Sequence, residues 1–238
     1  MVSSLDAASP ALVYFSLRSL EIRTEKDPVA PSLCTPGMKI RPATEADAAA
    51  IHAIYAPLIG TTALSFALEP PTVADIRRRI AETRARWPWL VCDDEGAVLG
   101  YANAGPDRAN RYRTRSAYDW SAEVSVYVQA GAQRRGIGRA LYTSLLAVLR
   151  HQGFVNAYAS ITLPNPGSVA LHRAMGFESV GVFRGEGYKL GQWHDVSWWQ
   201  VPLQDRKPSP SRPHDFEAVV TSDAGLAALE AGTALLKP

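Results

Sequence analysis

Residues 124–146 read VSVYVQAGAQRRGIGRALYTSLL, and this stretch decides which fold the chain adopts. In its first part Val124, Val126 and Val128 alternate with other residues, which is typical of a β-strand with one buried face. From Arg139 onward, apolar residues recur at helical spacing and predict an amphipathic helix. The stretch therefore predicts a strand and a helix joined by a turn of arginines and glycines.

The turn has the chemistry of an anion site. Backbone N–H groups at the start of a helix lack intrahelical partners, and the helix dipole adds positive charge there. A pyrophosphate group suits that position, and Gly136 and Gly138 have no side chains to block its approach. Three arginines can add charge-assisted contacts: Arg134, Arg135 and Arg139. A tight turn with solvated arginines explains the glycines equally well, and the spacing matches neither a Walker A loop nor a complete Gly-x-Gly-x-x-Gly turn.

Composition narrows the possible partners. A net charge of +2 gives no support for a nucleic-acid partner, and no apolar run approaches the roughly 20 residues of a membrane-spanning helix. Cys34 and Cys92 match no zinc spacing, and the five histidines form no ligand cluster, so no metal is expected. Two distant cysteines favour a reduced, cytoplasmic protein.

The chain divides into three parts. We expect a flexible N-terminal extension over 1–37, one compact domain over 38–203, and a C-terminal tail over 204–238 with a possible short helix. The tail begins with QDRKPSPSRPHD, which is rich in proline, serine and charge, as linkers are. Met38 also suits a start of translation.

The domain alternates between the two kinds of element. We expect strands at 38–42, 89–94, 97–105, 118–128, 153–162, 179–189 and 192–203. We expect helices at 48–55, 72–86 and 165–175, and another that starts at Arg139 and includes Val148. This order predicts an α/β fold, with a mixed central sheet flanked by helices on both faces.

The motif QRRGIG, between strand and helix, resembles the acetyl-coenzyme A motif of the Gcn5-related N-acetyltransferases. Further stretches are similar to the phosphinothricin and methionine-sulfone N-acetyltransferases, over about residues 38–203: RPATEADAAAIHAIY, WPWLV, AGP, AYDWSAEVSVYV, LHRAMGF and GYKLGQWHDVSWWQ. The resemblance implies that Arg134 to Arg139, with Ile137 among them, bind the pyrophosphate of the coenzyme.

The resemblance also implies the catalytic residues. Glu123 would act as the base that deprotonates the amine, through a water molecule. His172 would act as acid, as second base or as an orienting group. A solvent-facing strand glutamate and a packed helix histidine are the purely structural alternatives.

The resemblance implies the residues that bind the coenzyme, whereas candidates for the substrate come from their positions in the sequence. The backbone of Val126, Tyr127 and Val128 would pair with the pantetheine arm, and the Val128 N–H would face the oxyanion. Asn165 would hold the pantetheine amides, with Ser168 between it and His172 on one helix face. Substrate candidates precede the Glu123 strand or join the first two helices: Arg113, Arg115, Tyr118 and Phe66. Arg115 could hold a carboxylate, or this loop could be merely basic and solvated.

The sequence thus predicts an acetyl-coenzyme A-dependent N-acetyltransferase that modifies the α-amine of a small amino acid. Phosphinothricin, methionine sulfone and methionine sulfoximine are the compounds that the resemblance suggests, and it also suggests a homodimer. Cys92 lies in an expected core strand, so direct transfer is favoured over an acyl-cysteine. Two alternatives stay open: acetylation of a protein or peptide N-terminus, and a non-catalytic coenzyme-binding regulatory module.

Overall fold

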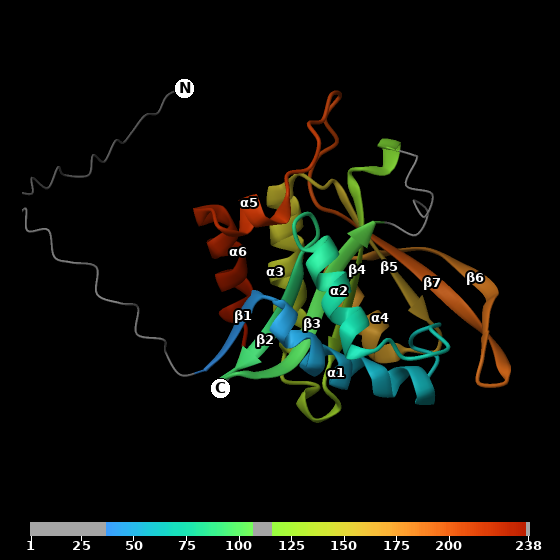
Figure 1. Ribbon diagram of the computed structural model, residues 1–238. Helices are drawn as coiled ribbons and strands as arrows, with labels where there is room; N and C mark the ends of the chain where they lie inside the picture. The colour runs from blue at the N-terminus through green and yellow to red at the C-terminus, as the bar shows by residue number, and fades with distance from the viewer. Residues whose placement is uncertain (1–36, 107–115, 237–238) are drawn as a thin grey trace, which may run out of the picture. The chain divides into compact units, whose positions relative to one another are not determined.

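The computed structural model describes residues 37–106 and 116–236, which form a seven-stranded sheet with helices packed on it (Figure 1). The strand order is β1-β2-β3-β4-β5-β7-β6, and β4 and β5 are parallel neighbours while the other pairs are antiparallel. The strands are β1 (Met38–Pro42), β2 (Trp89–Asp94), β3 (Ala97–Pro106), β4 (Ser121–Val128), β5 (Asn156–Thr162), β6 (Glu178–Lys189) and β7 (Gln192–Pro202). The predicted mixed sheet is confirmed.

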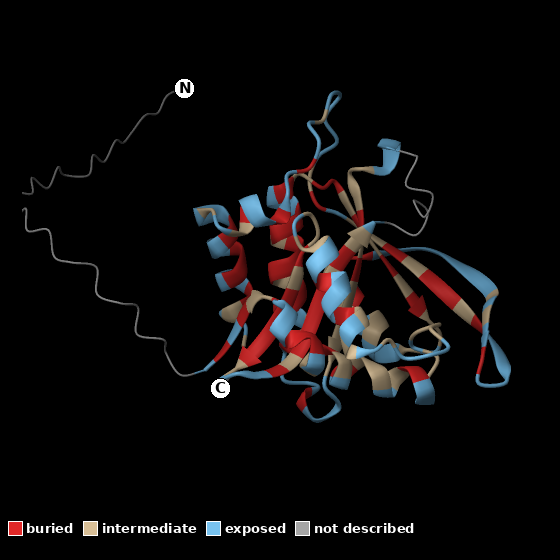
Figure 2. Ribbon diagram, viewed as in Figure 1, coloured by how far each residue is buried: buried red, intermediate tan, exposed pale blue. Residues whose placement is uncertain are grey.

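Helices cover both faces of the sheet, as predicted (Figures 1 and 2). They are α1 (Ala48–Thr61), α2 (Val73–Thr83), α3 (Ile137–Gln152), α4 (Pro166–Ala174), α5 (Phe216–Val220) and α6 (Asp223–Thr233). On one face α1 and α2 bury isoleucines, such as Ile51 and Ile80, against β2 and β3. On the other face Leu141 and Leu145 of α3 join a larger core that also includes Val124 of β4. Each such side chain contributes roughly 1.5–3 kcal/mol when it is fully buried.

The two parallel strands at the centre of the sheet separate along their length. Strands β4 and β5 pair only from Ser121 opposite Asn156 to Glu123 opposite Tyr158. Beyond that point β4 continues to Val128 and β5 to Thr162. The sheet therefore opens after Glu123, and the site lies at this opening.

Helix ends follow their local sequence signals. Thr72 and Asp75 form a capping box at the start of α2, with Asp75 N 3.1 Å from Thr72 Oγ1 and Thr72 N 2.9 Å from Asp75 Oδ2. Hydrogen bonds from the hydroxyl group and the backbone N–H of Thr72 to the Asp75 carboxylate lower the pKa of Asp75 to about 2. Gly176 follows α4 with a φ of +83°, as a glycine at a helix C-terminus does. Helix α1 is longer than predicted, since it passes Pro57 and buries Ile59.

The C-terminal region differs from the predicted tail. Helices α5 and α6 pack against α3, and the short helix expected in the tail is α6 (Figure 1). Ser144 Oγ donates a hydrogen bond of 3.0 Å to the carbonyl oxygen of Leu229, and Ile40 N donates one of 2.9 Å to Thr233 Oγ1. Ala228 and Leu229 are buried there. The sequence did not predict this packing. Helix α6 is rich in alanine and glycine, so it contacts its neighbour by close approach of the backbones and not through large apolar side chains.

Candidate active site

Glu123 stands where β4 and β5 part. It is the last β4 residue that pairs with β5, and it is half-buried. Ser160 Oγ of β5 donates a hydrogen bond of 3.1 Å to Glu123 Oε1. Because side chains alternate along a strand, Glu123 shares the α1/α2 face of the sheet with Ser125 and Tyr127. The carboxylate is therefore held at the mouth of the opening.

A cavity of about 120 Å³ occupies the opening itself. Residues 124–127 of β4 and 159–162 of β5 form its walls, and α4 contributes Asn165, Ser168 and His172. It thus brings Val126 and Tyr127 together with the three α4 residues that the sequence singled out. Asn165 also caps α4, because its side-chain oxygen accepts a hydrogen bond of 3.1 Å from Ser168 N.

The turn after β4 leads directly to the N-terminus of α3. Gly136 is the N-cap residue with a φ of +83°, and no side chain caps the helix there. The first-turn N–H groups thus have no capping side chain, which suits an anion. Ile137 is buried, so it can offer only its backbone, whereas the side chains of Arg134 and Arg135 are exposed. A Cβ atom on Gly138 would lie 3.3 Å from Leu171 Cδ2 of α4 and 3.7 Å from Val128 Cγ2 of β4.

His172 is held by hydrogen bonds at both ring nitrogens. Its Nδ1 lies 2.8 Å from the carbonyl oxygen of Ser168, which can only accept, so Nδ1 carries the proton. Its Nε2 lies 3.0 Å from the hydroxyl of Tyr142 on α3, which therefore donates to the neutral ring. Burial lowers the pKa of His172, and the bond to Ser168 opposes this only in part. Burial also raises the pKa of Tyr142. The pair is thus neutral and fixed in place.

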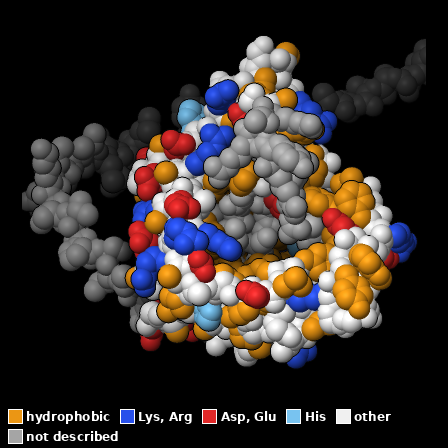
Figure 3. All heavy atoms as spheres, turned by 45° about the vertical axis from the view of Figure 1, so that its right-hand side comes forward, with side chains coloured by type: hydrophobic (Ala, Val, Ile, Leu, Met, Phe, Trp, Pro, Cys, Tyr) orange, Lys and Arg blue, Asp and Glu red, His pale blue; other side chains and the backbone are white. Residues whose placement is uncertain are grey.

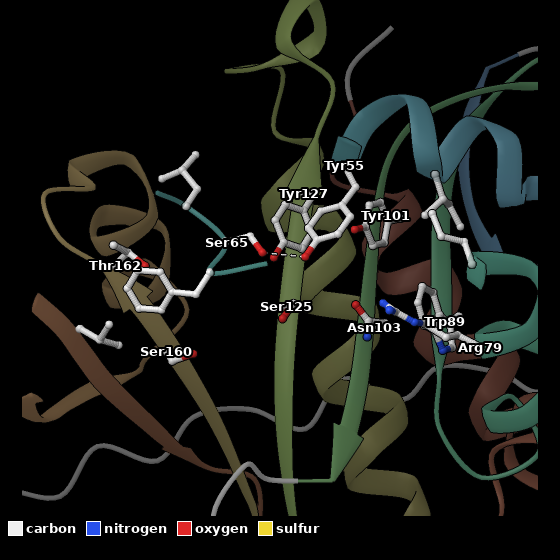
Figure 4. Close-up of a pocket in the computed structure, with 15 residues that line it drawn as sticks. Tyr55, Ser65, Arg79, Trp89, Tyr101, Asn103, Ser125, Tyr127, Ser160 and Thr162 are labelled. Carbon is white, nitrogen blue, oxygen red and sulfur yellow. Dashed lines mark hydrogen bonds between the residues drawn. The ribbon is translucent and has the colours of Figure 1, made fainter. Parts of the chain in front are cut away.

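A second cavity, of about 200 Å³, lies on the α1/α2 face of the sheet (Figure 4). Ser125, Tyr127, Ser160 and Thr162 line both cavities, so the two meet at the strand opening. Its walls include five aromatic residues, Tyr55, Phe66, Trp89, Tyr101 and Tyr127. A molecule in this cavity can therefore meet one that enters the opening from the α3 side.

The loop between α1 and α2 is anchored over the second cavity. Tyr55 Oη and Ser65 Oγ are 2.7 Å apart, and Lys189 Nζ donates a hydrogen bond of 2.6 Å to the carbonyl oxygen of Ser65. Burial lowers the pKa of Lys189. A Cβ atom on Gly187 would fall 2.5 Å from the Phe66 ring, so the glycine lets this ring lie against β6. These contacts place the predicted residue Phe66 in the cavity wall.

The structure does not place the other predicted substrate residues at the two cavities. Arg113 and Arg115 lie outside the described residues. Tyr118 is 39% exposed in a short 3-10 turn, and it is not among the described residues that line the two cavities.

Sequence reasoning missed several lining residues. Tyr142 lies among the leucines of α3, where a tyrosine is usually a core residue. Ser160 lies in an alternating strand, and nothing else in the sequence marks it as a site residue. The cavity residues Arg79 and Asn103 were not considered either.

In 37–106 and 116–236, no helix is both long and apolar enough to cross a membrane. Within these same ranges, no three His, Cys, Asp or Glu side chains come together as a metal site would require.

Comparisons with known proteins agree with this geometry. Residues 40–198 match the family described as acetyltransferase (GNAT) domain. A phosphinothricin N-acetyltransferase of Streptomyces viridochromogenes is 44% identical over 176 residues, 74% of this chain and 92% of that protein. An L-methionine sulfoximine/L-methionine sulfone acetyltransferase of Pseudomonas aeruginosa is 35% identical over 174 residues, 72% of this chain and 98% of that protein.

A solved structure is also similar. A GNAT superfamily phosphinothricin acetyltransferase of Sinorhizobium meliloti, in complex with acetyl-coenzyme A, superimposes with a TM-score of 0.68. It is 33% identical, and the match covers 74% of this chain and 94% of that one. With a family match over most of its length and relatives above 30% identity, this chain belongs to the GNAT acetyltransferase family.

Proposed function

We propose that this protein transfers the acetyl group of acetyl-coenzyme A to the α-amine of a small amino acid of the phosphinothricin or methionine sulfone type. The observation that carries the proposal is the meeting of two cavities at the β4/β5 opening, beside the Glu123 carboxylate. The names of the relatives supply the substrate class.

The coenzyme enters from the α3 side. Its pyrophosphate binds the N–H groups at the start of α3, with charge from Arg134, Arg135 and Arg139. Its pantetheine arm extends β4 along Val126–Val128, where β5 has separated from that strand. The side-chain oxygen of Asn165 is already engaged with Ser168 N, so its NH₂ group is what remains for a pantetheine carbonyl.

The amine enters from the other side, through the aromatic cavity. Glu123 accepts a proton from the ammonium group through water, and the freed amine attacks the thioester carbonyl carbon. The N–H of Val128 stabilises the oxyanion that forms. The carbon–sulfur bond then breaks, the thiolate takes up a proton, and the acetylated nitrogen loses its second proton. Transfer is direct, since Cys92 is fully buried in β2 and burial raises the pKa of its thiol to about 11.

His172 acts as an orienting group in this proposal. Both ring nitrogens are engaged, and the neutral ring has no free proton to deliver. It holds the Tyr142 hydroxyl at the wall of the opening, next to the proposed path of the pantetheine arm. Substitution of His172 is therefore expected to disturb coenzyme placement more than the pH dependence of turnover.

The assembly and location are proposals as well. The β6–β7 hairpin exposes Phe183, Tyr188 and Trp193, and hydrophobic side chains gather on the side of the molecule that Figure 3 brings forward. Such a surface is typical of a protein interface, so a homodimer is the proposed state. We place the protein in the cytoplasm because of its sparse, widely separated cysteines.

Release of free coenzyme A, measured over a panel of amines, tests the function. We expect turnover with methionine sulfone, methionine sulfoximine or phosphinothricin, weak turnover with lysine, and none with a peptide. A faster reaction with a peptide N-terminus would favour the protein-modifying alternative, which the anchored loop around Ser65 and Phe66 argues against. Coenzyme binding without turnover on any amine would favour a regulatory module.

A further inference from the structure

We propose that Arg79 and Asn103 form a subsite for the oxygen atoms at the end of the substrate side chain. This subsite makes the enzyme prefer amino acids whose side chain ends in an anionic oxyacid group. The inference rests on the proposed function and adds to it which end of the substrate these two residues bind.

The polar groups of the aromatic cavity favour an anion. Of the described residues that line it, Arg79 alone is charged. Within the described ranges its guanidinium forms no hydrogen bond or ion pair, and the same holds for the side-chain amide of Asn103. Figure 4 shows both residues beside Trp89, at the end of the cavity away from Ser160 and Thr162. Two sets of N–H donors therefore stand ready for oxygen acceptors.

The strand register places this subsite at a distance from the reaction. Ser125 of β4 lies opposite Asn103 of β3, and Asn103 lies opposite Trp89 of β2. Neighbouring strands are about 4.8 Å apart, so this row spans roughly 10 Å from β4 to β2. The amine reacts at β4, beside Glu123, whereas Arg79 approaches the row from α2, near its β2 end. The Arg79–Asn103 subsite is therefore separated from the reacting nitrogen by one to two strands.

The distance between this subsite and the reacting amine determines which oxygen atoms of the amino acid can reach the subsite. An α-carboxylate oxygen is three covalent bonds from the amine and stays beside it in any conformation. The oxygens of a phosphinate at the end of the phosphinothricin side chain are five bonds away and extend toward β2. The distal oxygens therefore suit Arg79 and Asn103, which leaves the α-carboxylate to a different residue.

The helix places Arg79 on the flank that borders the cavity. Ile76 and Ile80 are buried against the sheet, and Arg79 lies beside them on the flank of α2 that borders the cavity. Arg77 lies on the opposite flank; both arginines are exposed, but only Arg79 is among the described residues that line the cavity. Trp89, beneath the subsite, is fixed by a hydrogen bond of 3.0 Å from its Nε1 to Thr83 Oγ1. Arg77 thus provides a matched control on the same helix.

Two substrates of similar shape allow the effect of the side-chain charge to be measured separately. Phosphinothricin and methionine sulfone have the same chain length, and each ends in a tetrahedral atom that carries a methyl group and two oxygens. Only the phosphinate is anionic. We expect Arg79→Gln to lower kcat/KM for phosphinothricin about 10- to 100-fold, mainly through KM, because a charge-assisted hydrogen bond is replaced by a neutral one. The kcat/KM for methionine sulfone should fall by no more than about 3-fold, since the glutamine side chain still donates a hydrogen bond to a neutral oxygen.

Controls separate this role from others. Arg79→Lys should recover part of the phosphinothricin activity, and Arg77→Gln should change neither substrate. An equal loss on both substrates would overturn the proposal, because it would indicate contact with the shared α-carboxylate or a structural role. No loss on either would overturn it too. If the wild-type protein acetylates neither compound while it binds acetyl-coenzyme A in a calorimetric titration, the proposed function itself fails and the subsite fails with it.

Discussion

Replacing Gly232 with alanine tests whether α6 is part of the packed domain. Gly232 is the penultimate residue of α6 and faces α3. A Cβ atom there would overlap Ser144 Oγ and the carbonyl oxygen of Ala140, well inside van der Waals contact. The second of these is backbone, so it cannot rotate away. The substitution must push α6 away from α3.

The cost follows from three contributions. Overpacking of this kind costs about 1–3 kcal/mol. Separation of the helices also breaks the 3.0 Å hydrogen bond from Ser144 to Leu229, which costs about 1 kcal/mol. Alanine is the better helix former by roughly 0.5–1 kcal/mol, which offsets part of this loss. We therefore expect the free energy of unfolding to fall by about 1–3 kcal/mol, and Tm to fall by about 2–12 °C.

Gly60 offers a matched control. It is also the penultimate residue of its helix, α1, and a Cβ atom there would meet nothing within 4 Å. Gly60→Ala should leave the stability unchanged or raise it by up to about 1 kcal/mol. Thermal and urea unfolding of both variants, followed by circular dichroism, gives the comparison. If Gly232→Ala is as stable as Gly60→Ala, then α6 does not pack on α3 as described.

Three further predictions concern single residues. Glu123→Gln should lower turnover about 10²- to 10⁴-fold with coenzyme binding nearly intact, and a change within about twofold at neutral pH would exclude Glu123 as the base. Burial lowers the pKa of His172 below its ordinary value of 6.5, so the unfolded chain binds a proton below that pH that the folded protein does not. Stability should therefore decline as the pH falls through 6.5, and urea titrations should show a shallower decline for His172→Gln; equal slopes would contradict this. Thr72→Ala should cost about 1 kcal/mol through loss of the α2 cap, and an unchanged urea midpoint would show that the capping box with Asp75 contributes little.

The elements of the fold were predictable where one face of each element is buried against a single neighbour. Val124, Val126 and Val128 alternate because this side of β4 packs on the core that α3 completes. Helix α6 follows a different rule. Its contact with α3 depends on Gly232, which allows close approach, and Gly225 does the same toward α5. A search for periodic apolar residues cannot predict such a contact, because glycine has no side chain to contribute to the pattern.

The site was predictable in part for the same reason. Glu123 and His172 each sit in a local motif, so the sequence could single them out without knowledge of the partners. The contacts between elements were not visible, among them the Ser160–Glu123 and Tyr142–His172 hydrogen bonds, because the strand register and the crossing of α3 and α4 determine them.

Arg79 shows where sequence reasoning reaches its limit. In the run Arg77, Arg78, Arg79, helical spacing puts Arg77 and Arg79 at equal angles on either side of the buried isoleucine stripe. The sequence alone treats the two as equivalent. What distinguishes them is the position of α2 over the sheet, which turns one flank to the cavity beside Asn103 and the other away from it. Because that position is set by packing between distant elements, the proposed preference for an anionic substrate could be inferred only from the assembled fold.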